Sequence, residues 1–189
     1  MDRLTSDEDR DIKIADFSSD KKKVPENLEM DSDRLFYHKR NGNAEKARLL
    51  GSSIVREMIV GDINARLGIS DESKYPFQPQ IRLLTAFAAV IGLQTQLPDE
   101  LLAQMALSAF YETIQTSLPA FYEDIEDSAS FSFFFLAYRR GGDIERNIGR
   151  AFAAVCDADG DEVFAELGET LYSRVLMMVE QKAVAAAFL

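Results

Sequence analysis

The chain has 189 residues, of which 47% are hydrophobic, with one cysteine and a formal net charge of −11. A chain of this length buries about 70% of its unfolded surface, so a single domain can hold a core without cross-links. One cysteine excludes an intrachain disulfide, and the acidic balance argues against direct binding to nucleic acid or anionic lipid, because phosphate contacts need clustered Lys and Arg.

The first 33 residues are rich in charge and show no sustained apolar period, as in "SSDKKKVPENLEMDSD". Such a segment cannot offset its ordering entropy by burying apolar surface. We therefore expect a charged N-terminal arm over 1–33, flexible or loosely docked through Ile12, Ile14 and Phe17, before a helical domain at 34–189. A chain that begins near Asp33 is expected to keep its helical signal and its cooperative unfolding.

From residue 43 onwards the pattern is helical. An apolar stripe with a period near 3.6 covers 43–67, and Gly68 is placed to end that helix. The segment 81–93 is apolar on nearly every side, which is typical of a helix in the middle of a bundle. The next helix follows "QLPDE", and Pro119 is expected to end or kink it before a short helix in "AFYEDIED".

The segment "SASFSFFFLAYRRGGD" is ambiguous. Its aromatic residues favour a strand, but Phe131, Phe134, Phe135 and Tyr138 recur with helical spacing, so we predict a helix that Gly141 terminates. Asp143 is then expected to cap another helix, and a long final helix begins near residue 162. The sequence thus predicts an all-α, single-domain bundle of about six or seven helices.

One short segment repeats within the chain. "AFAAV" occurs at 86–90 and at 151–155, and each copy is followed by a loop and an acidic helix start, "DELLAQM" at 99–105 and "DEVFAEL" at 161–167. This echo indicates either a duplicated helical hairpin or a chance match between alanine-rich core helices.

The run "VCDADGDEVFAEL" places Asp157, Asp159 and Asp161 at alternate positions, like the first ligands of a helix–loop–helix calcium site. That loop also needs Gly at its sixth position and Glu at its twelfth, where this chain has Glu162 and Gly168. We therefore interpret the run as a helix end, a turn, and an Asp161 cap on the next helix.

The sequence gives little support for zinc sites, for a catalytic Cys–His dyad or for nucleotide binding. With one histidine (His38) and one cysteine (Cys156), a zinc site built from these ligands is excluded within one chain. Cys156 is expected to be a buried core residue, and a Cys–His dyad would require the fold to bring it to His38. No glycine-rich nucleotide motif is present. We assign no catalytic residue, metal or cofactor, and the sequence leans away from an enzyme.

The stretch "YRRGGDIERNIGR" is the one candidate binding site. We expect Arg139, Arg140, Arg146 and Arg150 to form a small patch for an anion or for the acids of a partner, next to a helix N-terminus. The alternative is structural: the arginines complement a helix end, and Asp143 already fills the free backbone N–H groups.

Charge is distributed unevenly along the chain. No Lys or Arg occurs from 83 to 138, against seven acids, whereas 36–66 has six bases and three acids. Such asymmetry suits a protein partner or self-association, although unequal solvated helix faces would look the same.

The start of the chain does not resemble a secretory signal, and the most apolar window, 83–93, is too short to span a bilayer. We predict a soluble, cytoplasmic, helical protein-binding module: an adaptor, regulator or inhibitor. Two alternatives remain, namely a small-ligand protein or enzyme that uses carboxylates and arginines, and an acidic decoy that imitates nucleic acid.

Overall fold

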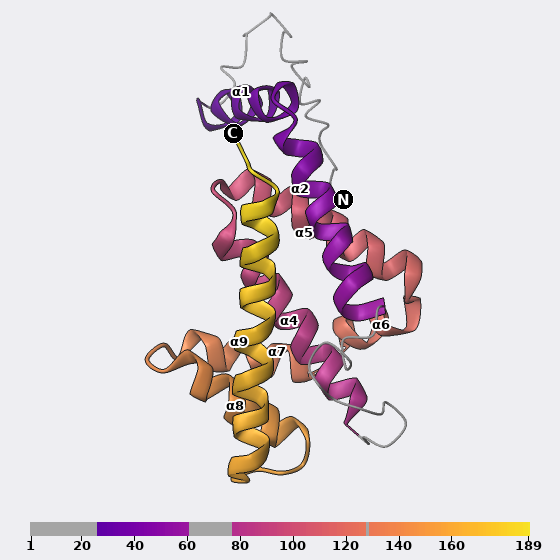
Figure 1. Cartoon of the computed structure of the whole chain (residues 1–189), viewed down its shortest axis with the longest axis vertical. Coiled ribbons are helices and arrows are strands. Elements are labelled where there is room, and N and C mark those ends of the chain that lie inside the picture. Colours follow the sequence, from indigo (N-terminus) through magenta and orange to yellow (C-terminus); the bar gives the residue numbers. More distant parts are fainter. Residues whose placement is uncertain (1–25, 61–76, 128) are drawn as a thin grey trace, which may run out of the picture.

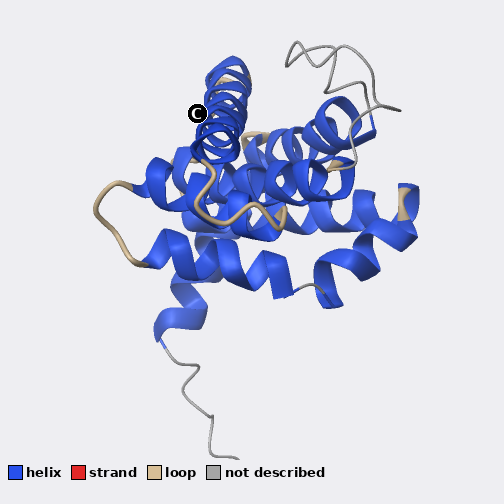
Figure 2. Ribbon diagram, turned by 90° about the horizontal axis from the view of Figure 1, so that it is seen from below, coloured by secondary structure: helices blue, strands red, loops and turns tan. Residues whose placement is uncertain are grey.

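A computed structural model describes residues 26–60, 77–127 and 129–189. Within these ranges the chain forms eight α-helices, one π-helical segment and no strand, which confirms the all-α bundle (Figures 1 and 2). The elements are α1 (Glu26–Arg40), α2 (Asn43–Ile54), the π-helix η1 (Val55–Val60), α4 (Gln78–Gln96), α5 (Glu100–Ser117), α6 (Pro119–Asp127), α7 (Ala129–Arg139), α8 (Ile144–Val155) and α9 (Glu162–Ala185).

Helix α1 is the element that the sequence did not indicate, and it raises the number of α-helices above the expected six or seven. It begins at Glu26, so the expected boundary between 33 and 34 falls inside it. The expected anchors Ile12, Ile14 and Phe17 lie outside the described residues. No apolar stripe marks α1 in the sequence. The contacts that attach it to the bundle include polar ones: Arg34 donates to Asp99 Oδ2 at 2.6 Å, and His38 Nε2 lies 3.4 Å from the same oxygen.

The segment 43–67, expected to form a single α-helix, is not α-helical throughout. After Ile54 the backbone changes to π-helical geometry through Val60, and Gly68 lies outside the described residues. An apolar stripe does not reveal this change, because a π-turn keeps the chain helical and only shifts the following side chains around the axis.

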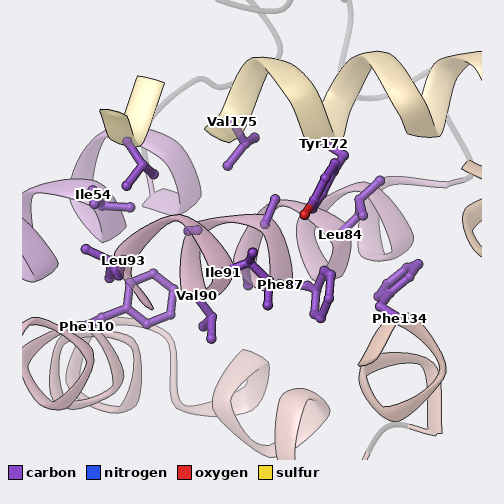
Figure 3. Packing of buried hydrophobic residues seen from close by; sticks show 14 of the residues in the cluster. Ile54, Leu84, Phe87, Val90, Ile91, Leu93, Phe110, Phe134, Tyr172 and Val175 are labelled. Atoms are coloured by element: carbon purple, nitrogen blue, oxygen red, sulfur yellow. The ribbon is translucent and has the colours of Figure 1, made fainter. Parts of the chain in front are cut away.

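Helix α4 is the centre of the core, as its sequence predicts. Every residue from Leu83 to Leu93 is buried. Figure 3 shows Phe87 of α4 near Tyr172 of α9 and Phe134 of α7. The ring centroid of Phe87 lies 6.4 Å from that of Tyr172 and 5.5 Å from that of Phe134. This cluster joins three helices that are distant in the sequence.

Helix α9 extends along the long axis and packs against both α4 and α8 (Figure 1). The segment after it returns to the start of α2. There the buried Asn43 donates to the Leu189 carbonyl at 2.7 Å, and the Leu189 amide donates back to Asn43 Oδ1 at 3.1 Å. One asparagine therefore makes a two-point contact with residue 189.

Several local predictions are confirmed. Pro119 separates α5 from α6, and the aromatic segment forms the helix α7. Asp143 and Asp161 cap α8 and α9 by accepting backbone N–H groups, as predicted. Asp99 caps α5 in the same way, although the sequence did not assign it that role. Among the helices in the described ranges, none combines the length and the apolar content needed to cross a membrane.

The two "AFAAV" segments lie in α4 and α8, and an Asp cap starts the helix after each of them. The packing of the two hairpins differs. Helices α8 and α9 contact each other closely, whereas α5 packs mainly against α2. The sequence echo therefore does not correspond to a repeated packing unit.

Candidate functional site

Helix α7 has two different faces. Phe131, Phe134 and Ala137 point into the core and are buried. On the opposite side Phe133 and Leu136 remain 42% and 58% exposed. The outward pair is large and apolar, so α7 presents hydrophobic surface to solvent beyond what its attachment to the core requires.

A tight turn joins α7 to α8. Gly141 and Gly142 have φ values of +68° and +71°, a region that residues with a Cβ rarely adopt. The Asn147 side-chain amide donates to the Gly141 carbonyl at 2.8 Å, and Asp143 Oδ1 accepts the Arg146 amide at 3.1 Å. These contacts fix the turn, so that α7 and α8 form a hairpin that projects to one side of the molecule (Figure 1).

A groove of about 250 Å³ lies between these two helices. On α7 its lining residues are spaced by three or four positions, which places them on one helical face. Apolar side chains of both helices line it, and its polar lining comes from the end of α7, from α8 and from Asp159, which follows α8. The lining residues are Phe133, Leu136, Ala137, Arg140, Asn147, Arg150, Ala151, Ala154 and Asp159. A smaller hollow lined by Ala129, Ser130, Phe133, Ala154 and Val155 continues the groove past Phe133.

The four predicted arginines do not lie together in one patch. Arg140 and Arg150 both line the groove. Arg146 is turned towards α9, where it forms ion pairs with Glu162 and with Glu169, the latter at 2.8 Å. Arg139 is exposed at the end of α7 and is not among the lining residues.

These positions give the arginines different electrostatic environments. Hydrogen bonds to Glu169 and then to Glu162 raise the pKa of Arg146 above its usual value, so Arg146 serves to tie α8 to α9. By contrast, Arg140 and Arg150 form no ion pair with any residue in the described ranges. The groove therefore presents two arginines without an ion-pair partner in the described ranges, together with apolar surface and the single carboxylate of Asp159.

The structural interpretation of the helix start is also confirmed in one respect. The N-terminus of α8 is the place where the sequence suggested that an anion could bind. There the Asp143 carboxylate already accepts the Arg146 amide, so this position is filled. The binding capacity of this region thus depends on the side chains of the groove and not on vacant backbone N–H groups.

The run with alternate aspartates forms the turn and the cap that the sequence indicated. Asp157 and Gly160 have φ values of +56° and +80°, and Asp161 accepts the amides of Val163 and Phe164. Among the described residues, no group of three or more His, Cys, Asp or Glu side chains is arranged to hold a metal ion.

The lone histidine and the lone cysteine are not brought together. His38 belongs to α1 and contacts Asp99 and Asn43, whereas Cys156 follows α8, towards the other end of the molecule (Figure 1). Burial, aided by the nearby Asp157, raises the pKa of the Cys156 thiol to about 11. The thiol is therefore protonated at neutral pH and is not an activated nucleophile.

Sequence reasoning missed most of the apolar lining and two polar groups, Asn147 and Asp159. Phe133 and Leu136 do carry a signal, since Ala129, Phe133, Leu136 and Arg140 are spaced 4, 3 and 4 apart and form a second stripe beside the buried one. No local pattern assigns Asn147 or Asp159 to the same groove, because the packing of α8 and of the segment after it brings them beside α7.

Comparison with known protein families, with characterised proteins and with solved structures finds no match to this chain.

Proposed function

We propose that this protein is a cytoplasmic, helical protein-binding module, an adaptor or regulator, and that the groove between α7 and α8 receives an amphipathic helix of the partner. The partner helix carries apolar residues on one face, with carboxylates that reach Arg140 and Arg150. The observation that supports the proposal is the pairing of exposed Phe133 and Leu136 with two arginines that lack ion-pair partners within the described ranges.

The shape of the groove favours a helix over a compact small molecule. Its rim residues Phe133, Leu136, Arg140 and Arg150 are all exposed, so the groove is open along its length. The α7 stripe from Ala129 to Arg140 covers 11 residue steps, or about 16 Å at 1.5 Å per residue. This length accommodates about three turns of a partner helix, a common way of binding an amphipathic segment.

Charge supports a carboxylate-bearing partner. The whole chain has a net charge of −11, so two arginines without carboxylate partners stand out against an acidic background. Apolar contact supplies most of the binding energy, while the arginines select acidic partners and orient them. The single cysteine, which is buried, is compatible with a reducing compartment.

The proposal is tested with a library of 16-residue peptides displayed on phage and selected on the full chain. We expect the enriched peptides to show apolar residues at i and i+4, with Asp or Glu in the adjoining turn. Synthetic peptides of the enriched type should bind with a Kd in the range of about 1–100 μM, as is typical of small interfaces.

Matched variants then locate the binding site. Arg140→Glu with Arg150→Glu, and separately Phe133→Asp, should weaken binding at least about tenfold. Arg139→Glu is the control, because it reverses a neighbouring charge outside the groove, and it should leave the Kd unchanged. Circular dichroism melts verify that each variant is folded. Lack of enrichment, or equal binding by the groove variants and the control, would contradict the proposal.

A further inference from the structure

Helix α1 lies at the end of the molecule opposite the α7–α8 hairpin and crosses the top of the bundle (Figure 1). Its inner side is attached through the buried His38 and through Arg34, which pairs with Asp99. Its outer side carries two large rings in contact with solvent, since Phe36 is 68% and Tyr37 is 57% exposed. Neighbouring exposed aromatic residues on one short helix indicate a contact surface.

Two charged residues flank these rings. Asp33 and Arg40 are exposed, and neither forms an ion pair with a residue in the described ranges. Asp33, Phe36, Tyr37 and Arg40 are spaced 3, 1 and 3 apart and so occupy one face of the helix. We call these four residues the α1 stripe.

The α1 stripe is complementary to itself. It reads acid, ring, ring, base along the helix, so a second α1 running in the opposite direction reads base, ring, ring, acid. The midpoint of the stripe lies between Phe36 and Tyr37. A two-fold axis there places Asp33 of one copy opposite Arg40 of the other, and Phe36 opposite Tyr37.

We propose that two copies of this chain associate through antiparallel α1 helices, with the two-fold axis between Phe36 and Tyr37. Two symmetric interfacial ion pairs and a central cluster of four rings form the contact. A two-fold arrangement uses the same surface on both copies and therefore closes as a dimer. The inner charges of α1 take no part, because Arg34 is already paired with Asp99 within one chain.

The size of the contact predicts a weak dimer. Helix α1 has 15 residues, which correspond to about 22 Å of helix. Two crossed helices of this length bury roughly half of the ~800 Å² per partner that a standard interface buries. We expect a Kd of about 10–1000 μM, and association that weakens as salt screens the exposed ion pairs.

The test is sedimentation equilibrium of the full chain from about 1 μM to 1 mM, a range that brackets the expected Kd. Wild type should change from monomer to dimer. Asp33→Arg and Arg40→Asp should each stay monomeric, because each places like charges opposite one another. An equimolar mixture of the two variants should associate again. In one contact the arginine introduced by Asp33→Arg faces the aspartate introduced by Arg40→Asp, and in the other contact the native Arg40 faces the native Asp33.

Two further variants complete the experiment. Lys39→Asp reverses an exposed charge of α1 outside the stripe, where Lys39 lines a separate groove with Leu35 and Arg48, and it should dimerise like wild type. Phe36→Ser changes no charge and should weaken association at least about tenfold. Wild type that is monomeric at 1 mM, variants that dimerise as wild type does, or a mixture that stays monomeric would each overturn the proposal.

Discussion

Asp99 has more structural roles than its place in a loop suggests. Its Oδ1 accepts the Leu101 amide at 2.7 Å and caps α5, while its Oδ2 accepts from Arg34 and lies near His38. Burial alone would raise the pKa of this carboxyl, but the hydrogen bonds from Arg34, Leu101 and His38 outweigh it and lower the pKa below 3.8. The ionised form is therefore the one that the fold stabilises.

The lowered pKa of Asp99 makes the free energy of unfolding decrease as the pH falls through the acidic range in which this carboxyl titrates. A carboxyl whose pKa is lower in the folded state stabilises the fold fully above its unfolded pKa near 3.8, and that contribution is lost as pH falls through the folded value. Asn still caps a helix, so Asp99→Asn removes mainly the charge. We expect it to lower the free energy of unfolding by about 1 kcal/mol at pH 7, since Arg34 is partly exposed and screened.

Urea denaturation at pH 7 and at pH 3 measures this effect. The difference between wild type and Asp99→Asn should be present at pH 7 and should shrink towards pH 3. A difference of equal size at both pH values would show that the charge of Asp99 is not its source.

At the scale of elements, close helix crossings organise the bundle. At Gly51 of α2, an added Cβ would lie 2.0 Å from the Ala106 carbonyl oxygen of α5. Gly149 of α8 and Gly168 of α9 meet the opposing helix in the same way, with added Cβ atoms 2.3 Å from the Ala165 carbonyl oxygen and 2.7 Å from the Phe152 Cβ. Glycine at these positions allows the backbones to approach closely.

The crossing of α2 and α5 gives a sharp prediction for Gly51→Ala. In an open helix this change would stabilise by about 0.5–1 kcal/mol, because alanine favours the helix. Here the new methyl group meets backbone that cannot move away locally, so we expect a net loss of about 1–3 kcal/mol. The adjacent Ser52→Ala is the control, because the Ser52 hydroxyl donates to the Leu49 carbonyl of its own helix. A Gly51→Ala chain as stable as the Ser52→Ala chain in thermal melts would show that the helices separate easily.

At the scale of the whole molecule, the proposed contacts lie at opposite ends. The α7–α8 hairpin, whose helices line the groove, is at one end of α9, and α1 is at the other (Figure 1). Occupation of one surface therefore leaves the other accessible, and a dimer formed through α1 would present two grooves that face away from the contact.

The boundary between the arm and the bundle can be tested at the same scale. The composition of residues 1–25 offers little apolar surface for burial, so a chain that begins at Glu26 should unfold at the same urea midpoint as the whole chain. A chain that begins at Asn41 lacks α1 and leaves Asp99 without Arg34 and His38. We expect that chain to lose about 1–3 kcal/mol, because a partly buried charge then lacks its donors.

A chain that begins near Asp33, as the sequence suggested, would lack the N-terminal part of α1. Equal stability of the chains that begin at Glu26 and at Asn41 would show that α1 contributes nothing to the fold.

Near neighbours in the sequence determined most of the secondary structure. The caps at Asp143 and Asp161, the break at Pro119 and the buried face of α7 follow from side chains within about one helical turn of one another, and the sequence predicted each of them. The buried position of α4 also follows from its sequence, because a helix that is apolar on all sides has no face for solvent.

The tertiary structure decided which helices meet, and with that the candidate site. Arg146 and Arg150 are four residues apart, yet one pairs with Glu169 of α9 and the other lines the groove with Arg140. Helix α1, which no apolar stripe indicates, contacts the bundle through Arg34, whose partner Asp99 lies 65 residues away. Local periodicity cannot predict such contacts, since they depend on the relative placement of elements that are distant in the chain.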